Sequence, residues 1–335
     1  MVNQIFNVRQ YRASQHKLKF AQKLRYCIRL PIIISALFLA GCTTGLVDDT
    51  AQRDLLQPWL EITGAQMSMS SGSLGTDYVM LQRPTAISVR GNNLYLVDAG
   101  LRRIFRYDNL QQTLSPFAVN LPVEAGMSIY AAADQSVYIT SPSYGKVLHF
   151  TGDGNVLPAL SSPGNLARPI SVTVDERSGR VLVADGLYNH IVIFSNAGMM
   201  LSIIKSPQVK SISAIAVGTG GIYAIDRLAK QVVVLGRDGS FRYAFAADSF
   251  SEPGTIAASR DNLVFVGDDF NNTLRTFNLQ GARGAFQVGK IGGAGAVSDN
   301  FSNISGLTVE GDMLYVADGL SGRIQTFLIN INAID

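Results

Sequence analysis

The sequence predicts an all-β fold, a six-bladed β-propeller with four-stranded antiparallel blades. One short unit occurs six times: a β-rich run that ends in Asp, a tight turn, and a second β-rich run. The period lies mostly in the low forties, measured between the residues that end the first run: Asp98, Ser141, Asp185, Asp226, Asp268 and Asp318. This spacing is typical of propeller blades. The 32 glycines provide for many turns, and no helical periodicity interrupts the series.

The first 41 residues have the features of an export signal. They are basic and contain no Asp or Glu, and they end in an apolar run over residues 30–40 that is too short to span a bilayer. The last three residues of this region and the cysteine that follows, Leu39-Ala40-Gly41-Cys42, resemble the bacterial lipobox. We therefore expect residues 1–41 to be a lipoprotein signal peptide and Cys42 to be the lipidation site.

The resemblance to bacterial lipoproteins also implies a location. The residue after the cysteine is Thr43 rather than Asp, which implies sorting to the outer membrane, with the protein facing the periplasm. Residues 42–57 would form the tether. The formal charge of +3 belongs to the leader, and the remaining chain is acidic overall, so we expect no nucleic-acid partner.

The propeller is expected over residues 58–330. Strands of small residues precede each unit, such as Ala86–Val89, and suit a crowded central axis. A fourth, outer run follows the first five units but not the sixth. We expect a strand at about 59–63, near the N-terminus, to supply the outer strand of the last blade, because propellers leave no open edge.

The repeated unit resembles the NHL repeat. The segments Asp98 to Arg103-Ile104 and Asp318 to Arg323-Ile324 carry the resemblance, which extends over about residues 80–330. The family includes lyases, lactonases and binding modules, so the resemblance indicates a fold and leaves the function open. The repeated Asp itself is interpreted as a structural residue that accepts backbone N–H groups at the end of its strand.

Metal-binding residues are sparse. After Cys42 the only histidines are His149 and His190, on different repeats, so we expect no transition metal and no cofactor. Lactonases of this family hold calcium with Glu, Asn and Asp near the channel mouth. Glu124 and Glu252 precede innermost strands and leave an oxygen-ligated ion of this type open.

One face of the propeller offers the candidate binding residues. The connections between the second and third strands should share that face with the long inter-blade connections, which include 64–83 and 291–304. Aromatic and Arg side chains are the residue types that anchor interfaces. The candidates are Arg102, Tyr144, Tyr188, Asn189, Arg227, Phe270 and Asn271.

These observations favour a membrane-anchored binding module for an envelope protein or glycan. Two alternatives remain. One is a calcium-dependent hydrolase or lactonase, and the other is a structural subunit of a secretion or polysaccharide-export assembly.

Overall fold

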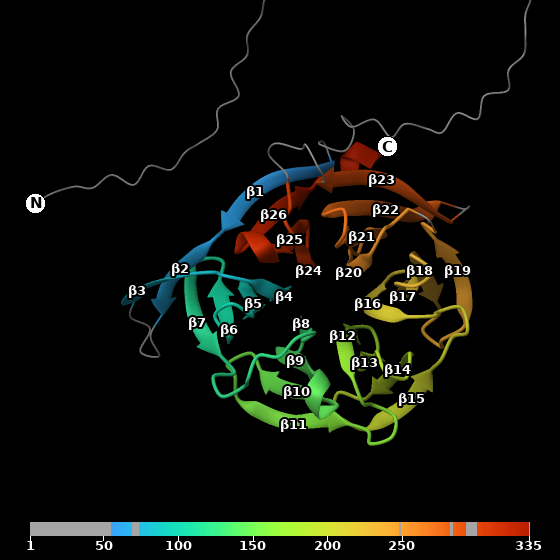
Figure 1. The fold of residues 1–335 in the computed structure, drawn as a ribbon, viewed down its shortest axis with the longest axis horizontal. Coiled ribbons are helices and arrows are strands. Elements are labelled where there is room, and N and C mark those ends of the chain that lie inside the picture. Colours follow the sequence, from blue (N-terminus) through green and yellow to red (C-terminus); the bar gives the residue numbers. More distant parts are fainter. Residues whose placement is uncertain (1–54, 69–73, 248, 282–283, 293–299, 335) are drawn as a thin grey trace, which may run out of the picture. The chain divides into compact units, whose positions relative to one another are not determined.

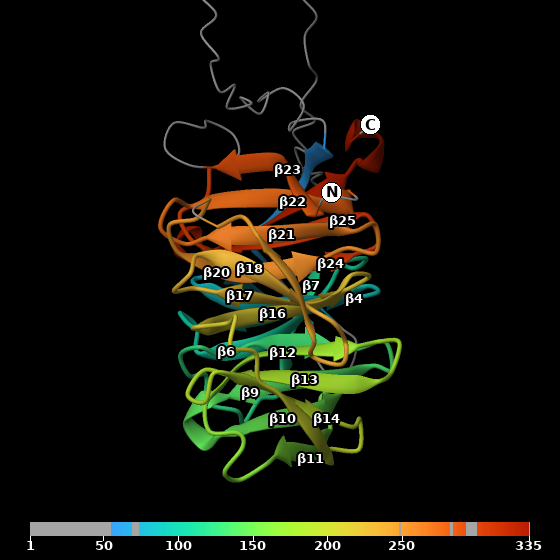
Figure 2. The same ribbon diagram turned by 90° about the vertical axis from the view of Figure 1, so that its right-hand side faces the viewer.

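The computed structural model describes residues 55–68, 74–247, 249–281, 284–292 and 300–334. Cys42, the expected signal peptide and most of the expected tether lie outside this range. Six sheets surround a central axis, which confirms the six-bladed all-β propeller (Figure 1). From the side, the strands run approximately along the axis, so the connections gather at its two ends (Figure 2). Among the described residues, no helix is long and apolar enough to cross a membrane.

Each blade is an antiparallel meander that runs from the axis outward. The strands of blades one to three are β4 (Pro84–Arg90), β5 (Asn93–Asp98), β6 (Arg103–Asp108) and β7 (Thr113–Phe117); β8 (Ile129–Ala131), β9 (Ser136–Ser141), β10 (Lys146–Thr151) and β11 (Val156–Ser161); and β12 (Pro169–Asp175), β13 (Arg180–Asp185), β14 (His190–Phe194) and β15 (Met200–Ile204). Those of blades four to six are β16 (Ile212–Gly218), β17 (Gly221–Asp226), β18 (Gln231–Leu235) and β19 (Phe241–Phe245); β20 (Pro253–Ala258), β21 (Leu263–Asp268), β22 (Thr273–Gly281) and β23 (Gly284–Gly292); and β24 (Ile304–Glu310), β25 (Met313–Asp318) and β26 (Arg323–Ile329). Three short 3₁₀ helices are η1 (Pro142–Tyr144), η2 (Gly319–Ser321) and η3 (Ile331–Ile334).

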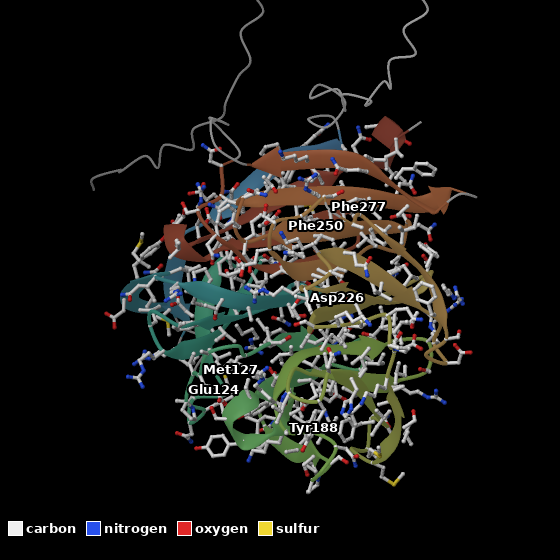
Figure 3. The ribbon with its side chains drawn as sticks, turned by 45° about the vertical axis from the view of Figure 1, so that its right-hand side comes forward. Glu124, Met127, Tyr188, Asp226, Phe250 and Phe277 are labelled. Carbon is white, nitrogen blue, oxygen red and sulfur yellow. The ribbon has the colours of Figure 1, made fainter. Side chains whose placement is uncertain are left out.

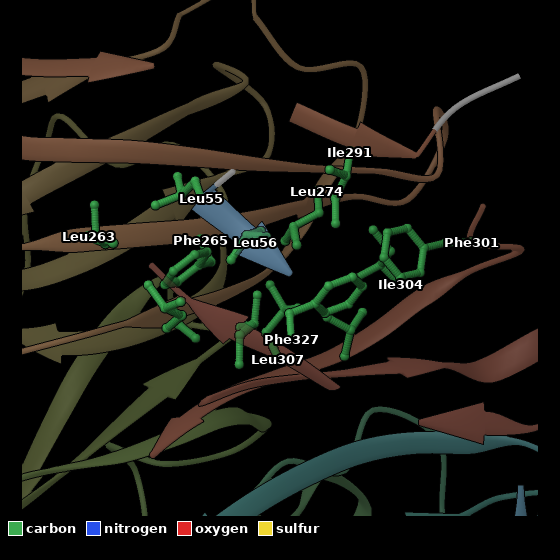
Figure 4. Packing of buried hydrophobic residues seen from close by; sticks show 14 residues of the cluster. Leu55, Leu56, Leu263, Phe265, Leu274, Ile291, Phe301, Ile304, Leu307 and Phe327 are labelled. Carbon is green, nitrogen blue, oxygen red and sulfur yellow. The ribbon is translucent and has the colours of Figure 1, made fainter. Parts of the chain in front are cut away.

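The N-terminal strand β1 (Leu56–Ile62) is the outer strand of blade six. It runs antiparallel to β26, from the pair Leu56–Ile329 to the pair Ile62–Ile324. From the sequence we expected this outer strand at about residues 59–63, which lie largely within β1. Leu55 and Leu56 pack into the cluster that contains Phe265, Leu274 and Phe327 (Figure 4). The two ends of the described chain are thus held in one sheet.

The segment 64–83 differs from the loop that we expected. It contains a hairpin of β2 (Gly64–Ser68) and β3 (Leu74–Met80), and β2 pairs in parallel with β7, so blade one has six strands. Ala65 is buried and Met67 packs against the core of this blade, which gives the hairpin an apolar anchor. The expected loop 291–304 is also too long, because β23 extends to Gly292.

The core lies between neighbouring sheets. Leu182 and Ile193 of blade three, for example, pack with Ile215 and Ile222 of blade four. Full burial of each such side chain contributes about 1.5–3 kcal/mol. Close to the axis the blades leave little room: a Cβ on Gly306 would lie 3.2 Å from Ile87 of the next blade. This crowding explains the small residues of the innermost strands.

Candidate functional site

A central cavity of about 590 Å³ follows the propeller axis and is the candidate site. All six innermost strands line it, and their side chains alternate between hydroxyl groups, such as Ser171 and Ser213, and aliphatic groups, such as Ile87 and Ile215. We call the end that carries the connections between second and third strands the loop face, and the opposite end the turn face.

The turn-face end of the cavity is crossed by Arg90. This blade-one side chain donates to Glu176 of blade three at 2.8 Å and to Glu310 of blade six at 3.3 Å. The Tyr130 hydroxyl also donates to Glu176, and burial, followed by the nearby Glu176 carboxylate, raises the pKa of Tyr130. Because these contacts join blades that are not all neighbours, they reach across the axis. A ligand therefore has its easier access from the loop face.

The repeated aspartates organise the loop face. Asp268 is fully buried and accepts N–H groups from Ser251 at 2.8 Å and Glu252 at 3.0 Å, both just before β20. Asp226 makes the equivalent bonds with Lys210 and Ser211 before β16 (Figure 3). The structural interpretation of the repeated Asp is thus confirmed. Each carboxylate joins the loop that enters its blade to the loop that follows the second strand.

Hydrogen bonding has a clear electrostatic effect at Asp185. Burial raises the pKa of its carboxyl, but N–H groups from Tyr188, Ala167, Arg168 and Leu187 outweigh burial, so the net pKa is below the ordinary value. The carboxylate therefore stays charged and bonded at neutral pH.

Blade two uses Glu124 in place of the missing Asp. Ser141 has no carboxylate, and Glu124 reaches from the preceding inter-blade loop to accept from the Ser141 hydroxyl and the Ser143 N–H (Figure 3). Burial raises the pKa of Glu124, and these hydrogen bonds outweigh it and lower the pKa. Glu124, which the sequence left open as an ion ligand, thus has a structural role within its own blade.

The residue that follows the repeated Asp lines the cavity in blades three, four and five, where it is Gly186, Arg227 and Asp269. Its N–H donates to the carbonyl of the residue before the innermost strand: Asp269 to Glu252 at 2.9 Å, Arg227 to Ser211 at 2.8 Å, and Gly186 to Arg168 at 2.9 Å. Arg168 and Ser211 also line the cavity. In blades three and four, both of these repeat positions thus contribute to the mouth.

Two of the mouth charges form a pair. The Arg227 guanidinium of blade four contacts the Glu252 carboxylate of blade five, and both side chains are about half exposed. Asp269 also lies here, and its Oδ1 is buried without a hydrogen-bond partner among the described residues. Burial raises the pKa of Asp269 to about 6, while Arg227 opposes the rise and Asp268 adds to it.

The seven sequence-predicted binding residues all lie in loop-face connections, but only Arg227 lines the cavity. Tyr144, Tyr188 and Phe270 have exposed fractions of 68%, 41% and 73%. The Tyr144 ring lies 5.3 Å from the Lys146 ammonium, and Tyr188 contacts the His190 ring (Figure 3).

The remaining predicted residues are Arg102, Asn189 and Asn271. Arg102 is exposed and has a φ of 54°. The Asn189 amide donates to the Val209 carbonyl and accepts from the Ile212 N–H, and Asn271 donates to Ser251 and Asp268. Both asparagine side chains thus have structural bonds within the loop face.

A set of exposed apolar residues lies in the loop-face connections. They occupy the second position after the repeated Asp, on four consecutive blades, and are exposed by between 61% and 73%: Leu187, Leu228, Phe270 and Leu320. We call these four residues the apolar ring. Blades one and two have Gly100 and Ser143 at the same position, so the ring is open on that side.

The two histidines of the propeller lie apart from the cavity lining. His149 stacks on Tyr138 with 4.4 Å between ring centroids and contacts the Ser136 hydroxyl. His190 bonds to the Asn165 carbonyl. Within the described ranges, no three His, Cys, Asp or Glu side chains are grouped in a way that would hold a metal ion.

The known proteins that resemble this chain share its fold, at low sequence identity. No protein-family model matches this chain, and no curated protein sequence matches it. Solved structures do: virginiamycin B lyase from Staphylococcus aureus superposes with a TM-score of 0.57 at 13% identity, covering 81% of this chain and 99% of that one.

Two further structures have similar scores. A Bacteroides thetaiotaomicron protein of unknown function has a TM-score of 0.61 at 12% identity, covering 81% of this chain and 77% of that one. The Kuenenia stuttgartiensis hydrazine synthase has a TM-score of 0.55 at 10% identity, covering 79% and 88%. Such proteins differ in activity, so the shared propeller does not define a function.

Proposed function

We propose that this protein is a binding propeller that holds an envelope protein on its loop face while an acylated Cys42 tethers it to the outer membrane, facing the periplasm. The observation that carries the proposal is the apolar ring. The NHL resemblance is compatible with it, because that family includes pure binding modules.

The ring has the physical character of an interface. Its four members are each well exposed and come from one repeat position, so one flat partner surface can cover them together. Burying each of them would contribute about 1.5–3 kcal/mol. Leu228 and Phe270 directly follow the mouth residues Arg227 and Asp269 in the chain, so a partner that covers the ring would also exclude water from these charged groups.

The ring favours a protein partner over a glycan. Three of its four members are leucines, which pack against apolar protein surfaces but offer no flat ring for a sugar to stack on. The aromatic candidates Tyr144 and Tyr188 extend the same face and suit either partner.

The test is capture of membrane proteins by the tethered, full-length protein. A variant with Leu187→Ser, Leu228→Ser, Phe270→Ser and Leu320→Ser should lose the captured partner, with little change in melting temperature, because all four side chains are exposed.

The matched control changes exposed apolar residues on the turn face. Leu110 and Met199, which are 75% and 66% exposed, lie in connections between third and fourth strands. Leu110→Ser with Met199→Ser should leave capture intact. Equal loss in both variants would contradict the proposal.

A second candidate is the calcium-dependent hydrolase. The observation that favours it is the set of oxygen donors at the mouth, where Asp269 and Asn303 line the cavity and Glu252 lies beside them. Stoichiometric calcium binding in a calorimetric titration, lost in Asp269→Asn, would support this candidate against the binding module.

A further inference from the structure

Blade five differs from the other blades at the residue that follows the repeated Asp. The residue after the repeated Asp (or Ser141) is uncharged in four blades and charged in two: Ala99, Pro142, Gly186, Arg227, Asp269 and Gly319. Arg227 has a carboxylate partner in Glu252, whereas the Asp269 carboxyl has no ion pair among the described residues. Blade five therefore places a carboxyl group without an ion pair among the described residues in the wall of the cavity.

The same blade makes room for this group. The innermost strand β20 has Gly254 beneath Asp269, and a Cβ there would lie 2.2 Å from Asp269 Oδ2. The corresponding residues of blades four and six are Ser213 and Ser305. Gly254 thus leaves the space that the carboxyl group of Asp269 occupies in blade five.

The surroundings of Asp269 determine what it can bind. The charged groups that act on its carboxyl are Arg227 from blade four and the buried Asp268 that precedes it, and its backbone N–H bonds to Glu252 at the entry to blade five. Asp268 already accepts from backbone N–H groups and from the Asn271 amide, and Arg227 is engaged with Glu252. A buried carboxylate oxygen without a donor is costly, so a ligand that supplies N–H donors and one positive charge would be stabilised here.

We propose that Asp269 binds a primary ammonium group presented at the loop-face mouth of the channel. This inference rests on the proposed function in one respect: the ammonium belongs either to a small molecule in the cavity or to a lysine of the captured protein. The hydroxyl groups that line the cavity, such as Ser213 and Ser305, suit a polar carrier of the ammonium.

A single positive charge fits this site better than a divalent cation. Calcium requires six to eight oxygen ligands, and the Glu252 carboxylate is engaged with Arg227. The Arg227 guanidinium beside the site would also repel a divalent ion more strongly than a monovalent one.

The test is an NMR titration of the Asp269 carboxyl with ethanolamine as the probe. Ethanolamine should lower the pKa of Asp269 from about 6 in a saturable way, because the bound ammonium stabilises the carboxylate. Ethylene glycol, which lacks the charge, should have no such effect. The proposal would be overturned if ethanolamine left the pKa of Asp269 unchanged, or if calcium chloride lowered this pKa and ethanolamine did not.

Two variants test the same point. Ethanolamine binding is measured here by calorimetric titration, because Asp269→Asn has no carboxyl group to follow by NMR. Asp269→Asn should weaken binding by at least about tenfold, and Gly254→Ala should weaken it by displacing the carboxyl group. Asp153→Asn removes an equal charge on the turn face and should leave binding unchanged. Full ethanolamine binding by Asp269→Asn would refute the assignment.

Capture of the partner by Asp269→Asn identifies the source of the ammonium. Lost capture assigns the group to a lysine of the partner, and retained capture assigns it to a small molecule, provided that ethanolamine binds the wild-type protein. Ethanolamine binding is measured without any partner, so the proposed function and this inference can fail separately.

Discussion

The amide N–H of Asp269 donates to the carbonyl of Glu252 at 2.9 Å, and this bond joins the backbones of two acidic residues at the mouth of the channel. Only one of them has a cationic partner, because Arg227 contacts Glu252. The bond itself belongs to the repeated architecture, in which Asp268 fixes the same two loops. The function is thus expected to depend on the side chains at this mouth and not on the hydrogen bonds that most blades share.

The raised pKa of Asp269 predicts a pH effect on stability. Its pKa is about 6 in the folded protein and about 3.8 in an ordinary environment, so the folded state binds more protons between these values and loses stability as the pH rises through this window. Asp269→Asn removes the penalty and should raise the free energy of unfolding at pH 7 by about 1 kcal/mol, allowing for solvent screening. Below pH 4 the two proteins should be alike.

Denaturant unfolding at pH 4 and pH 7 checks this prediction. A variant that is less stable than the wild type at pH 7 would show that Asp269 has a stabilising partner.

Asp185 predicts the opposite pH dependence. The pKa of Asp185 is lowered in the folded protein, so its stabilising contribution is present above the ordinary pKa of 3.8 and is lost as the pH falls below it. Asp185→Ala leaves several N–H groups without their acceptor and should cost about 3 kcal/mol or more at pH 7. Calorimetric melting should show this loss, and Asp153→Ala on the exposed turn face should show almost none.

Blade closure predicts different results for two leucines of β1. Leu56 is 3% exposed and packs in the cluster with Phe327, whereas Leu60 is 40% exposed. Leu56→Ala should cost about 2–5 kcal/mol through lost contacts and the resulting cavity. Leu60→Ala should cost less than about 1 kcal/mol, because an exposed side chain loses few contacts. Equal effects in thermal unfolding would show that β1 contributes little to blade six.

Membrane tethering predicts a specific mature N-terminus. Mass spectrometry should find a chain that begins at a lipid-modified Cys42, because Leu39-Ala40-Gly41-Cys42 resembles the lipobox. Cys42→Ser should abolish the modification and release the protein from membrane fractions. An unmodified N-terminus at another residue would exclude the lipoprotein assignment.

The sequence was sufficient for the fold because propeller repeats are local. Each unit has its own strand pattern, and the same pattern in six units strengthens the prediction of a propeller. The hairpin of β2 and β3 was missed because it has no counterpart in the other repeats and lies in a segment rich in Ser and Gly. The contact of Glu124 with Ser141 was missed because the partners lie 17 residues apart and only folding joins them.

The candidate site was predicted less completely. Arg227 was identified because an arginine in a loop is conspicuous, but Leu187, Leu228 and Leu320 were overlooked, since leucine in a sequence usually indicates core. Asp269 follows a structural Asp and could not be told from it by residue type. The available signal was the repeat position, because the residue after the structural Asp lines the cavity in blades three to five and the next residue is exposed in blades three to six.

The most direct test of the proposed function is site-specific photocrosslinking in cells. Benzoylphenylalanine at Leu228 in the apolar ring should crosslink the protein to one envelope protein, while the same group at Leu110 on the turn face should not, although both positions are more than 70% exposed. A crosslinked partner at Leu110 with none at Leu228 would contradict the assignment of the loop face as the binding surface.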